Sequence, residues 1–131
     1  MARYLGIDYG TKRIGISLSD EGGKIAFPRD VVSSEWKTFF PFIANLIRKE
    51  HARGVVVGLA RGLGGEETKM TKEIRSFAQK LERELSVSVH LEDEVLSTKA
   101  VLRGPTKKEK IDASSAALIL QSYLDRKNMI Q

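Results

Sequence analysis

An aspartate interrupts an apolar segment near the start of the chain: Asp8 lies in LGIDYGTKRIGI, residues 5–16. An ionised carboxylate is strongly disfavoured in a strand unless its charge is compensated, and at functional sites a metal ion or a phosphate-linked cation does this. The glycines on either side of Asp8 allow another backbone or a ligand to approach closely. Two more acidic positions lie far downstream, at residues 92–94 (Glu-Asp-Glu) and at Asp112. Their joint chemistry depends on whether they meet in space.

The elements around these carboxylates are arranged in a way that could bring them together. Asp8 is late in a strand expected over residues 4–9, and the acidic run ends a strand expected over 87–91. If these strands are parallel, both acidic positions lie at one edge of the sheet, and Asp112 opens a last helix that could pack across that edge. Converging carboxylates without thiols or clustered imidazoles favour Mg²⁺ or Mn²⁺. Two such ions about 4 Å apart can activate water and stabilise the leaving oxygen of a phosphodiester.

Each carboxylate also has a purely structural interpretation. Asp8 can be a hairpin turn residue, and residues 92–94 can be a solvated exit from a strand. Asp112 can cap a helix, because acidic residues are favoured in the first helical turn. Spacing alone leaves these alternatives open.

The hydrophobic pattern predicts an α/β fold. Period-2 patterns and turn signals indicate strands at 4–9, 13–19 and 25–32, which short turns would join into an antiparallel meander. Helical spacing then indicates a helix from Trp36 that kinks or restarts at Pro41 and closes at 53–54. The remaining expected elements are a buried strand at 55–57, a helix at 67–85, a strand at 87–91, a short helix at 97–102 and a last helix at 112–126. This order predicts a mixed five-stranded sheet, with the antiparallel meander followed by parallel crossovers and with helices on both faces.

Composition and length limit the classes of protein that this chain can represent. The 131 residues fit one domain over 1–131, 41% of them hydrophobic and none of them cysteine, so disulfides and thiolate metal sites are excluded. No apolar stretch is long enough to span a bilayer, and no signal-peptide pattern is recognisable, so we expect a cytoplasmic protein. The net charge of +5 favours a polyanionic partner. Basic residues cluster before the last helix, at Lys99, Arg103, Lys107, Lys108 and Lys110, although such a run can also be a solvated loop.

Three further features have alternative interpretations. The glycine-rich segment at 58–66 could cradle a phosphate at a helix N-terminus, or face a substrate, or be a plain connection, and it lacks the P-loop pattern. His51 and His90 are isolated, which favours structural roles. Trp36, Phe39 and Phe40 recur at helical spacing, which favours core packing over base stacking.

Four segments form a recognisable set: GIDYGTKRIG (6–15), VGL (57–59) before the glycine-rich loop, DEVLST (93–98) and DASSAALILQSYL (112–124). Together they resemble the bacterial YqgF family, also called RuvX or Holliday-junction-resolvase-like. They follow the family's order and cover essentially the whole chain. Two departures concern substrate contacts: Val95 stands where the family usually has Arg, and Ala60-Arg61 stands where it usually continues Gly-Leu-Pro.

The resemblance implies an RNase H-like fold and a metal-dependent nuclease that processes the 5′ end of pre-16S ribosomal RNA. Carried over by motif, Asp8, Glu94 and Asp112 are the catalytic, metal-binding carboxylates, expected to hold two Mg²⁺ or Mn²⁺ ions. We expect phosphate or other nucleic-acid contacts from Lys12, Arg13, Arg61, Lys107, Lys108 and Lys110.

The implied partner is structured RNA or branched DNA, bound by a monomer or a homodimer, with no membrane involved. Resolution of four-way DNA junctions is one alternative function, and a non-catalytic RNA-binding assembly factor is another. A sugar kinase or actin-like ATPase shares the Asp-x-Gly-Thr loop but needs two such domains around its nucleotide, whereas 131 residues supply one.

Overall fold

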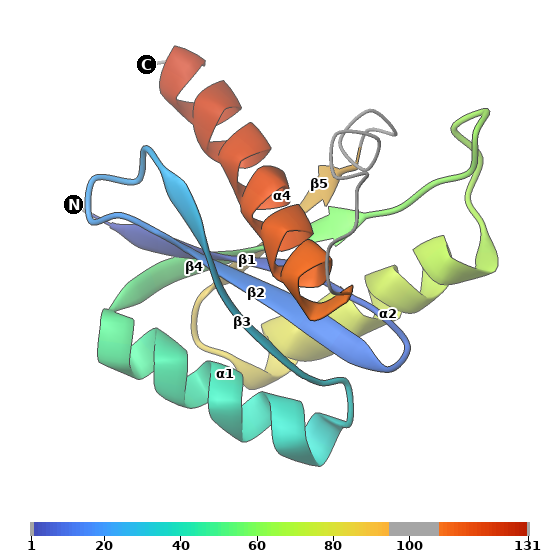
Figure 1. Cartoon of the computed structure of the whole chain (residues 1–131), viewed down its shortest axis with the longest axis horizontal. Helices are drawn as coiled ribbons and strands as arrows, with labels where there is room; N and C mark the ends of the chain where they lie inside the picture. The colour runs from blue at the N-terminus through green and yellow to red at the C-terminus, as the bar shows by residue number, and fades with distance from the viewer. Residues whose placement is uncertain (1, 95–107, 131) are drawn as a thin grey trace.

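Five strands form one mixed sheet with the order β3-β2-β1-β4-β5 (Figure 1). The computed structural model describes residues 2–94 and 108–130, and for residues 108–112 and 130 it describes the backbone alone. The strands are β1 (Arg3–Asp8), β2 (Arg13–Ser19), β3 (Ala26–Ser33), β4 (Ala52–Leu59) and β5 (Ser88–Asp93). The β1–β2 and β2–β3 pairs are antiparallel, whereas β1–β4 and β4–β5 are parallel. The predicted meander with parallel crossovers is confirmed.

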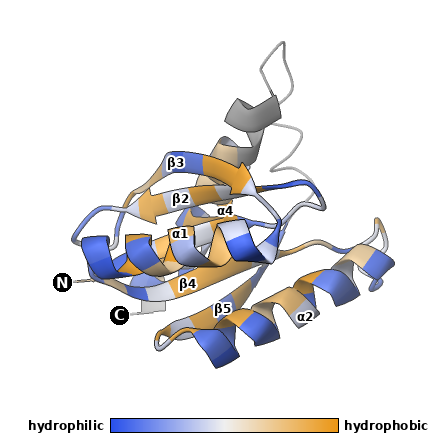
Figure 2. Cartoon of the chain, turned by 90° about the horizontal axis from the view of Figure 1, so that it is seen from below, coloured by the Kyte–Doolittle hydropathy of each residue, from blue (hydrophilic) through white to orange (hydrophobic). Residues whose placement is uncertain are grey.

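Helices cover both faces of this sheet, as predicted. The helices α1 (Trp36–Glu50) and α2 (Lys69–Glu84) lie against one face, and α4 (Lys108–Ile130) crosses the other (Figures 1 and 2). Figure 2 shows hydrophobic residues dominating β4, whereas α2 alternates between hydrophilic and hydrophobic residues. Within residues 2–94 and 108–130, no helix combines the length and apolar character needed to cross a bilayer.

Strand alternation divides the apolar residues between two cores. On β1, Leu5 and Ile7 belong to the larger core, with α1 and α2. Tyr4 belongs to the smaller core under α4, which also contains Leu120 and Leu124. Even-numbered positions of β1 therefore face α4, and the same alternation directs Asp8 toward the α4 side at the end of the strand.

The helix α4 packs closely against the sheet at Gly6. A β-carbon at Gly6 would lie 2.7 Å from both the Ala116 carbonyl oxygen and the Leu120 Cβ. In the same place, the Ser17 hydroxyl donates a 2.8 Å hydrogen bond to the Ala116 carbonyl. Further along α4, the Tyr123 ring lies 5.8 Å from the Tyr4 ring. The helix therefore runs antiparallel to β1, with its N-terminal part toward the Asp8 end of the strand.

Several element boundaries differ from the sequence prediction. The last helix spans 108–130 rather than 112–126, so Asp112 lies in its second turn instead of opening it; lysine and glutamate at 108–110 are good helix formers and extend it. The strand β5 continues to Asp93, which places two acidic residues inside the strand. The helix α1 passes through Pro41 without a restart, and its C-cap is His51 in the left-handed conformation, not residues 53–54. The expected short helix at 97–102 lies outside the described residues.

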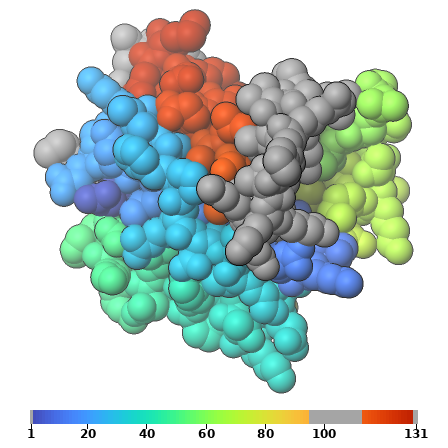
Figure 3. Space-filling model, viewed as in Figure 1, coloured from blue at the N-terminus to red at the C-terminus, as the bar shows by residue number. Residues whose placement is uncertain are grey.

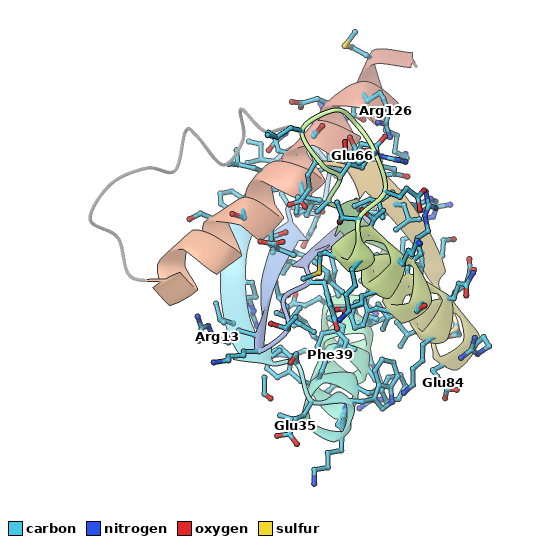
Figure 4. The ribbon with its side chains drawn as sticks, turned by 90° about the vertical axis from the view of Figure 1, so that its right-hand side faces the viewer. Arg13, Glu35, Phe39, Glu66, Glu84 and Arg126 are labelled. Carbon is cyan, nitrogen blue, oxygen red and sulfur yellow. The ribbon has the colours of Figure 1, made fainter. Side chains whose placement is uncertain are left out.

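The Trp36, Phe39 and Phe40 side chains pack against the larger core, as their spacing predicted. Phe39 is fully buried, while Trp36 and Phe40 are partly buried at its margin. Figure 4 shows Phe39 between α1 and the rest of the molecule, and Glu35, just before the helix, at its outer end.

The contact at Gly6 leads to a stability prediction. We expect Gly6→Ala to lower the free energy of unfolding by roughly 3 kcal/mol, because the new methyl group meets the Ala116 carbonyl of the α4 backbone and the Ser17 hydroxyl that is hydrogen-bonded to it. The measurement is urea unfolding followed by circular dichroism. Gly22→Ala is the matched control, since its nearest neighbour is Asp20 Oδ2 at 3.6 Å, and it should change stability by less than about 0.5 kcal/mol. Equal effects of the two substitutions would contradict this account of the helix contact.

Candidate nucleic-acid cleavage site

A cleft with a volume of about 370 Å³ opens at the carboxyl end of the parallel strands and contains both Asp8 and Glu94. Asp8 ends β1, and Glu94 directly follows β5. Parallel strands present their carboxyl ends at the same sheet edge, where ligands of open α/β sheets gather. The other lining residues are Tyr9, Gly10, Thr11, Lys12, Arg13, Ala60, Met70 and Ile74. The two carboxylates that the sequence placed at one edge do share one cleft.

The strand between these carboxylates, β4, leaves room for them because it carries a glycine there. A β-carbon at Gly58 would lie 3.1 Å from Glu94 Cγ and 2.5 Å from Ile119 Cδ1 of α4. The Glu94 side chain therefore lies over Gly58, on the α4 side of the sheet. The Glu94 backbone N–H donates to the Leu59 carbonyl at 3.1 Å, which fixes the start of this segment. Asp8 is directed to the same side by strand alternation.

The third expected carboxylate occupies a helix position consistent with this edge. Asp112 is four residues before Ala116, so it lies on the same face of α4, one turn closer to the N-terminus. Because α4 runs antiparallel to β1, going back one turn from Ala116 to Asp112 moves in the same direction as going from Gly6 to Asp8 along the strand. The Asp112 side chain is outside the described part of the structure. Among the side chains that are described, no group of three or more acidic or histidine residues forms a metal cluster.

The expected cationic residues fall into three groups. Lys12 and Arg13 line the cleft beside Asp8, and their turn is tied to the end of β3 by two hydrogen bonds, from Ser34 Oγ to the Thr11 carbonyl (2.6 Å) and from Ser34 N–H to the Lys12 carbonyl (3.1 Å). The lysines at 108 and 110 belong to the first turn of α4, with side chains outside the described part, and Lys107 is outside the described residues altogether.

Arg61 occupies a different environment, with carboxylates around it. Its Nε donates to Asp93 Oδ1 at 3.1 Å, and its Nη1 lies 3.7 Å from Glu67 Oε2. Two carboxylates close to one guanidinium offset its charge. A phosphate contact by Arg61 remains a prediction, and these ion pairs would have to rearrange for it.

The glycine-rich loop uses several of its backbone donors internally. Gly62 N–H donates to the Glu66 carbonyl, and Gly64 N–H donates to the Glu66 carboxylate, both at 2.9 Å. Thr68 caps α2 by accepting a hydrogen bond from the Thr71 N–H at 3.3 Å. Donors engaged in this way are not free for a phosphate, so the geometry favours a connecting loop over a phosphate cradle.

Tyr9 was not singled out by the sequence, although it follows Asp8 directly. Its ring lies 4.7 Å from the Phe77 ring, on the α2 side of the sheet. Burial raises the pKa of the Tyr9 phenol, and the negative charge of Glu73 raises it further. The phenol is therefore protonated at neutral pH and can donate a hydrogen bond at the cleft.

The acidic run at 92–94 is not a uniform solvated strand exit. Glu92 is only 4% exposed and faces α4. Its Oε2 accepts hydrogen bonds from Ser122 Oγ (2.9 Å) and Arg126 Nη1 (3.0 Å), and its Oε1 lies 2.6 Å from Arg126 Nη2. Asp93 faces the other side, toward Arg61, and Glu94 lines the cleft. Strand alternation separates Asp93 from Glu92 and Glu94, and Glu94 differs from Glu92 because it lies past the end of the strand, at the cleft. Three adjacent carboxylates thus occupy three environments, which composition alone does not reveal.

Solved structures with the same architecture show the fold class of this chain. The Thermus thermophilus RuvC structure in complex with a Holliday junction substrate matches with a TM-score of 0.59 and 14% identity, covering 98% of this chain and 97% of that one. The fowlpox virus Holliday junction resolvase matches with a TM-score of 0.55 and 11% identity, over 95% and 99% of the two chains. These likenesses concern the fold. Together with the sheet order, they show that this chain has an RNase H-like fold.

The chain belongs to the RuvX family, whose model, described as Holliday junction resolvase, matches residues 2–126. A protein of Oleidesulfovibrio alaskensis is 39% identical over 94% of this chain and 92% of its own length. One of Rickettsia typhi is 32% identical over 92% of this chain and 83% of its own length. Both carry the name "Putative pre-16S rRNA nuclease". The family resemblance seen in the motifs is confirmed.

The Glu92–Arg126 pair leads to a second stability prediction. We expect Arg126→Met to lower the free energy of unfolding by about 1–3 kcal/mol, because it leaves the buried Glu92 carboxylate without its cation. Urea unfolding at neutral pH is the measurement, with the exposed Arg83→Met on α2 as control. The double variant Glu92→Gln/Arg126→Met should recover part of the loss. Failure of that recovery would show that Arg126 stabilises α4 by other means.

Proposed function

We propose that this protein is a metal-dependent nuclease that hydrolyses phosphodiester bonds in structured RNA, acting in the maturation of the 5′ end of pre-16S ribosomal RNA. The observation that carries the proposal is the shared cleft, in which Asp8 and Glu94 lie beside Lys12 and Arg13. Carboxylates and cationic side chains in one cleft suit a phosphate substrate, because its negative charge can be neutralised partly by metal ions on the carboxylates and partly by the lysine and arginine. The curated names of the relatives support ribosomal RNA as the substrate. We propose residues 1–131 as one nuclease domain acting in the cytoplasm.

The described residues fit divalent metal ions of the oxygen-preferring type. Asp8 and Glu94 supply carboxylate oxygens, and Gly58 between them leaves the space over β4 that a β-carbon would fill. Asp112 is proposed as the third carboxylate, from its position on the face of α4 that also carries Ala116. Two Mg²⁺ or Mn²⁺ ions would supply activation of water and stabilisation of the leaving oxygen.

The remaining cleft residues bind and orient the substrate in this proposal. Lys12 and Arg13 contact the phosphates next to the scissile bond, and the Tyr9 phenol donates a hydrogen bond to substrate. Because phosphate neutralisation releases counterions, binding weakens strongly with salt. Lys107, Lys108 and Lys110 are proposed to extend these phosphate contacts; of the three, Lys108 and Lys110 belong to the first turn of α4.

Resolution of four-way DNA junctions is the second candidate, and the description of the matching family model favours it. A resolvase must cut two strands symmetrically, which is most simply achieved by a homodimer. A non-catalytic RNA-binding assembly factor is the third candidate, but carboxylates facing phosphate would weaken binding in a protein that never holds a metal ion.

The deciding experiment measures cleavage of two labelled substrates, a pre-16S 5′-leader fragment and a four-way DNA junction, with Mn²⁺ and with EDTA. We expect metal-dependent cleavage of the RNA. Asp8→Asn and Glu94→Gln should each reduce the rate by more than about a hundredfold, since even changes to residues supporting metal ligands cost 10–100-fold. Glu82→Gln, an exposed carboxylate of α2, is the matched control and should cleave normally.

Each result selects one candidate. Symmetric cleavage of the junction alone would assign the resolvase function. Tight RNA binding without cleavage in any metal would support the assembly factor. Full cleavage by Asp8→Asn would remove the proposed site.

A further inference from the structure

A second groove, with a volume of about 480 Å³, lies next to the cleft on the α2 side of the sheet. Its walls are aromatic, from Tyr9, Trp36 and Phe77, and its rim is mainly basic. The other lining residues are Ser34, Lys69, Lys72, Glu73, Ser76 and Lys80. Tyr9 also lines the cleft that contains Asp8, so the two hollows are adjacent.

The basic rim comes from one stripe of α2. The groove residues of this helix are at 69, 72, 73, 76, 77 and 80, which are the spacings of three and four that place side chains on one face. Three of them are lysines and one is Glu73, so the stripe carries a net positive charge. Lys69 and Lys72 are exposed, and no ion pair involving either is present among the described residues. A stripe of this kind suits a row of phosphates.

The aromatic wall suits a flat, uncharged ligand group. Trp36 is partly buried, with Phe40 stacked against it at 5.2 Å and the edge of Phe77 at 6.3 Å. The Lys80 ammonium lies 4.2 Å from the centre of the Trp36 ring. Aromatic neighbours hold the indole in place, and the group over it is the flexible tip of a lysine, which a planar ligand can displace.

We propose that this groove binds a single-stranded RNA segment that continues from the cleft, with a base stacked on Trp36 and its phosphates along Lys69, Lys72 and Lys80. The inference rests on the proposed nuclease function and adds a substrate subsite to it. Aromatic rings and lysines in one groove are the combination that recognises single strands, because bases stack on the rings while the cations follow the backbone. A duplex keeps its bases stacked inside and cannot use Trp36 in this way. In the bound state, Lys80 moves from the indole to a phosphate.

The experiment uses the intrinsic fluorescence of Trp36, which is the single tryptophan of the chain. The full-length Asp8→Asn variant is titrated with single-stranded oligouridylate of about eight nucleotides, within the range of known single-strand sites. An RNA duplex of the same length and inorganic polyphosphate are titrated as controls. We expect quenching by the single strand and little quenching by the duplex or by polyphosphate, which carries charge but no bases.

Variants separate stacking from charge. The double variant Lys69→Gln/Lys72→Gln should weaken binding of the single strand about tenfold at low salt. It should also make the plot of log binding constant against log salt concentration less steep by about 1.4, because each lost phosphate contact on a single strand removes roughly 0.7 from the slope. Lys49→Gln, an exposed lysine at the far end of α1, is the matched control and should bind normally. Trp36→Phe should retain most of the affinity, because phenylalanine can still stack on a base, and Trp36→Leu should lower the affinity about tenfold. Filter binding measures the affinities of these variants, which have no tryptophan fluorescence. Circular dichroism checks that each variant is folded.

The outcomes distinguish this inference from the proposed function. If wild-type protein cleaves RNA but single strands leave Trp36 fluorescence unchanged, the nuclease function stands and the groove is not a subsite. Equal quenching by polyphosphate would also overturn base stacking, as would unchanged affinity in the double lysine variant. Quenching by single strands together with weakened lysine variants supports the subsite even if no cleavage is found.

Discussion

The close packing of α4 on β1 is the contact on which the rest of the site depends. Gly6 has no side chain, so the helix backbone comes close enough for the Ser17 hydroxyl to bond directly to the Ala116 carbonyl. This contact fixes both the height and the direction of α4 over the sheet. Because Asp112 is one turn before Ala116, the same contact decides where the third carboxylate position lies relative to Asp8. Figure 3 shows α4 lying alongside the N-terminal strands in one continuous surface.

The second attachment of α4 lies at its other end. Glu92 of β5 binds Arg126 and Ser122, and Figure 4 shows Arg126 near the upper end of the view, far from Arg13. One helix is thus held to β1 and to β5, the two strands that lead to the carboxylates of the cleft. Burying Glu92 costs desolvation, which the ion pair with Arg126 and the hydrogen bond from Ser122 offset.

The two hollows of the protein follow from the two faces of β1. Asp8 is directed to the α4 side, and the next residue, Tyr9, to the α2 side, where it meets Phe77. A carboxylate and an aromatic ring are therefore adjacent in sequence but belong to different surfaces that join at the end of the strand. In the proposed complex, a phosphate chain passing this point would meet the carboxylates of the cleft first and the lysines and aromatic rings of the groove next.

The sequence by itself determined the order of strands and helices, the mixed sheet and the family, because hydrophobic periodicity and short motifs are local properties of the chain. It also identified Asp8 and Glu94, whose place at the ends of parallel strands predicts that they meet. Only the tertiary structure decided that the Glu92 side chain is buried, since burial depends on which face of β5 lies under α4. The neighbours of Arg61 and the groove beside Trp36 likewise required the packed structure. Each depends on side chains brought together from elements that are distant in sequence, and no local pattern records which charges and rings become neighbours.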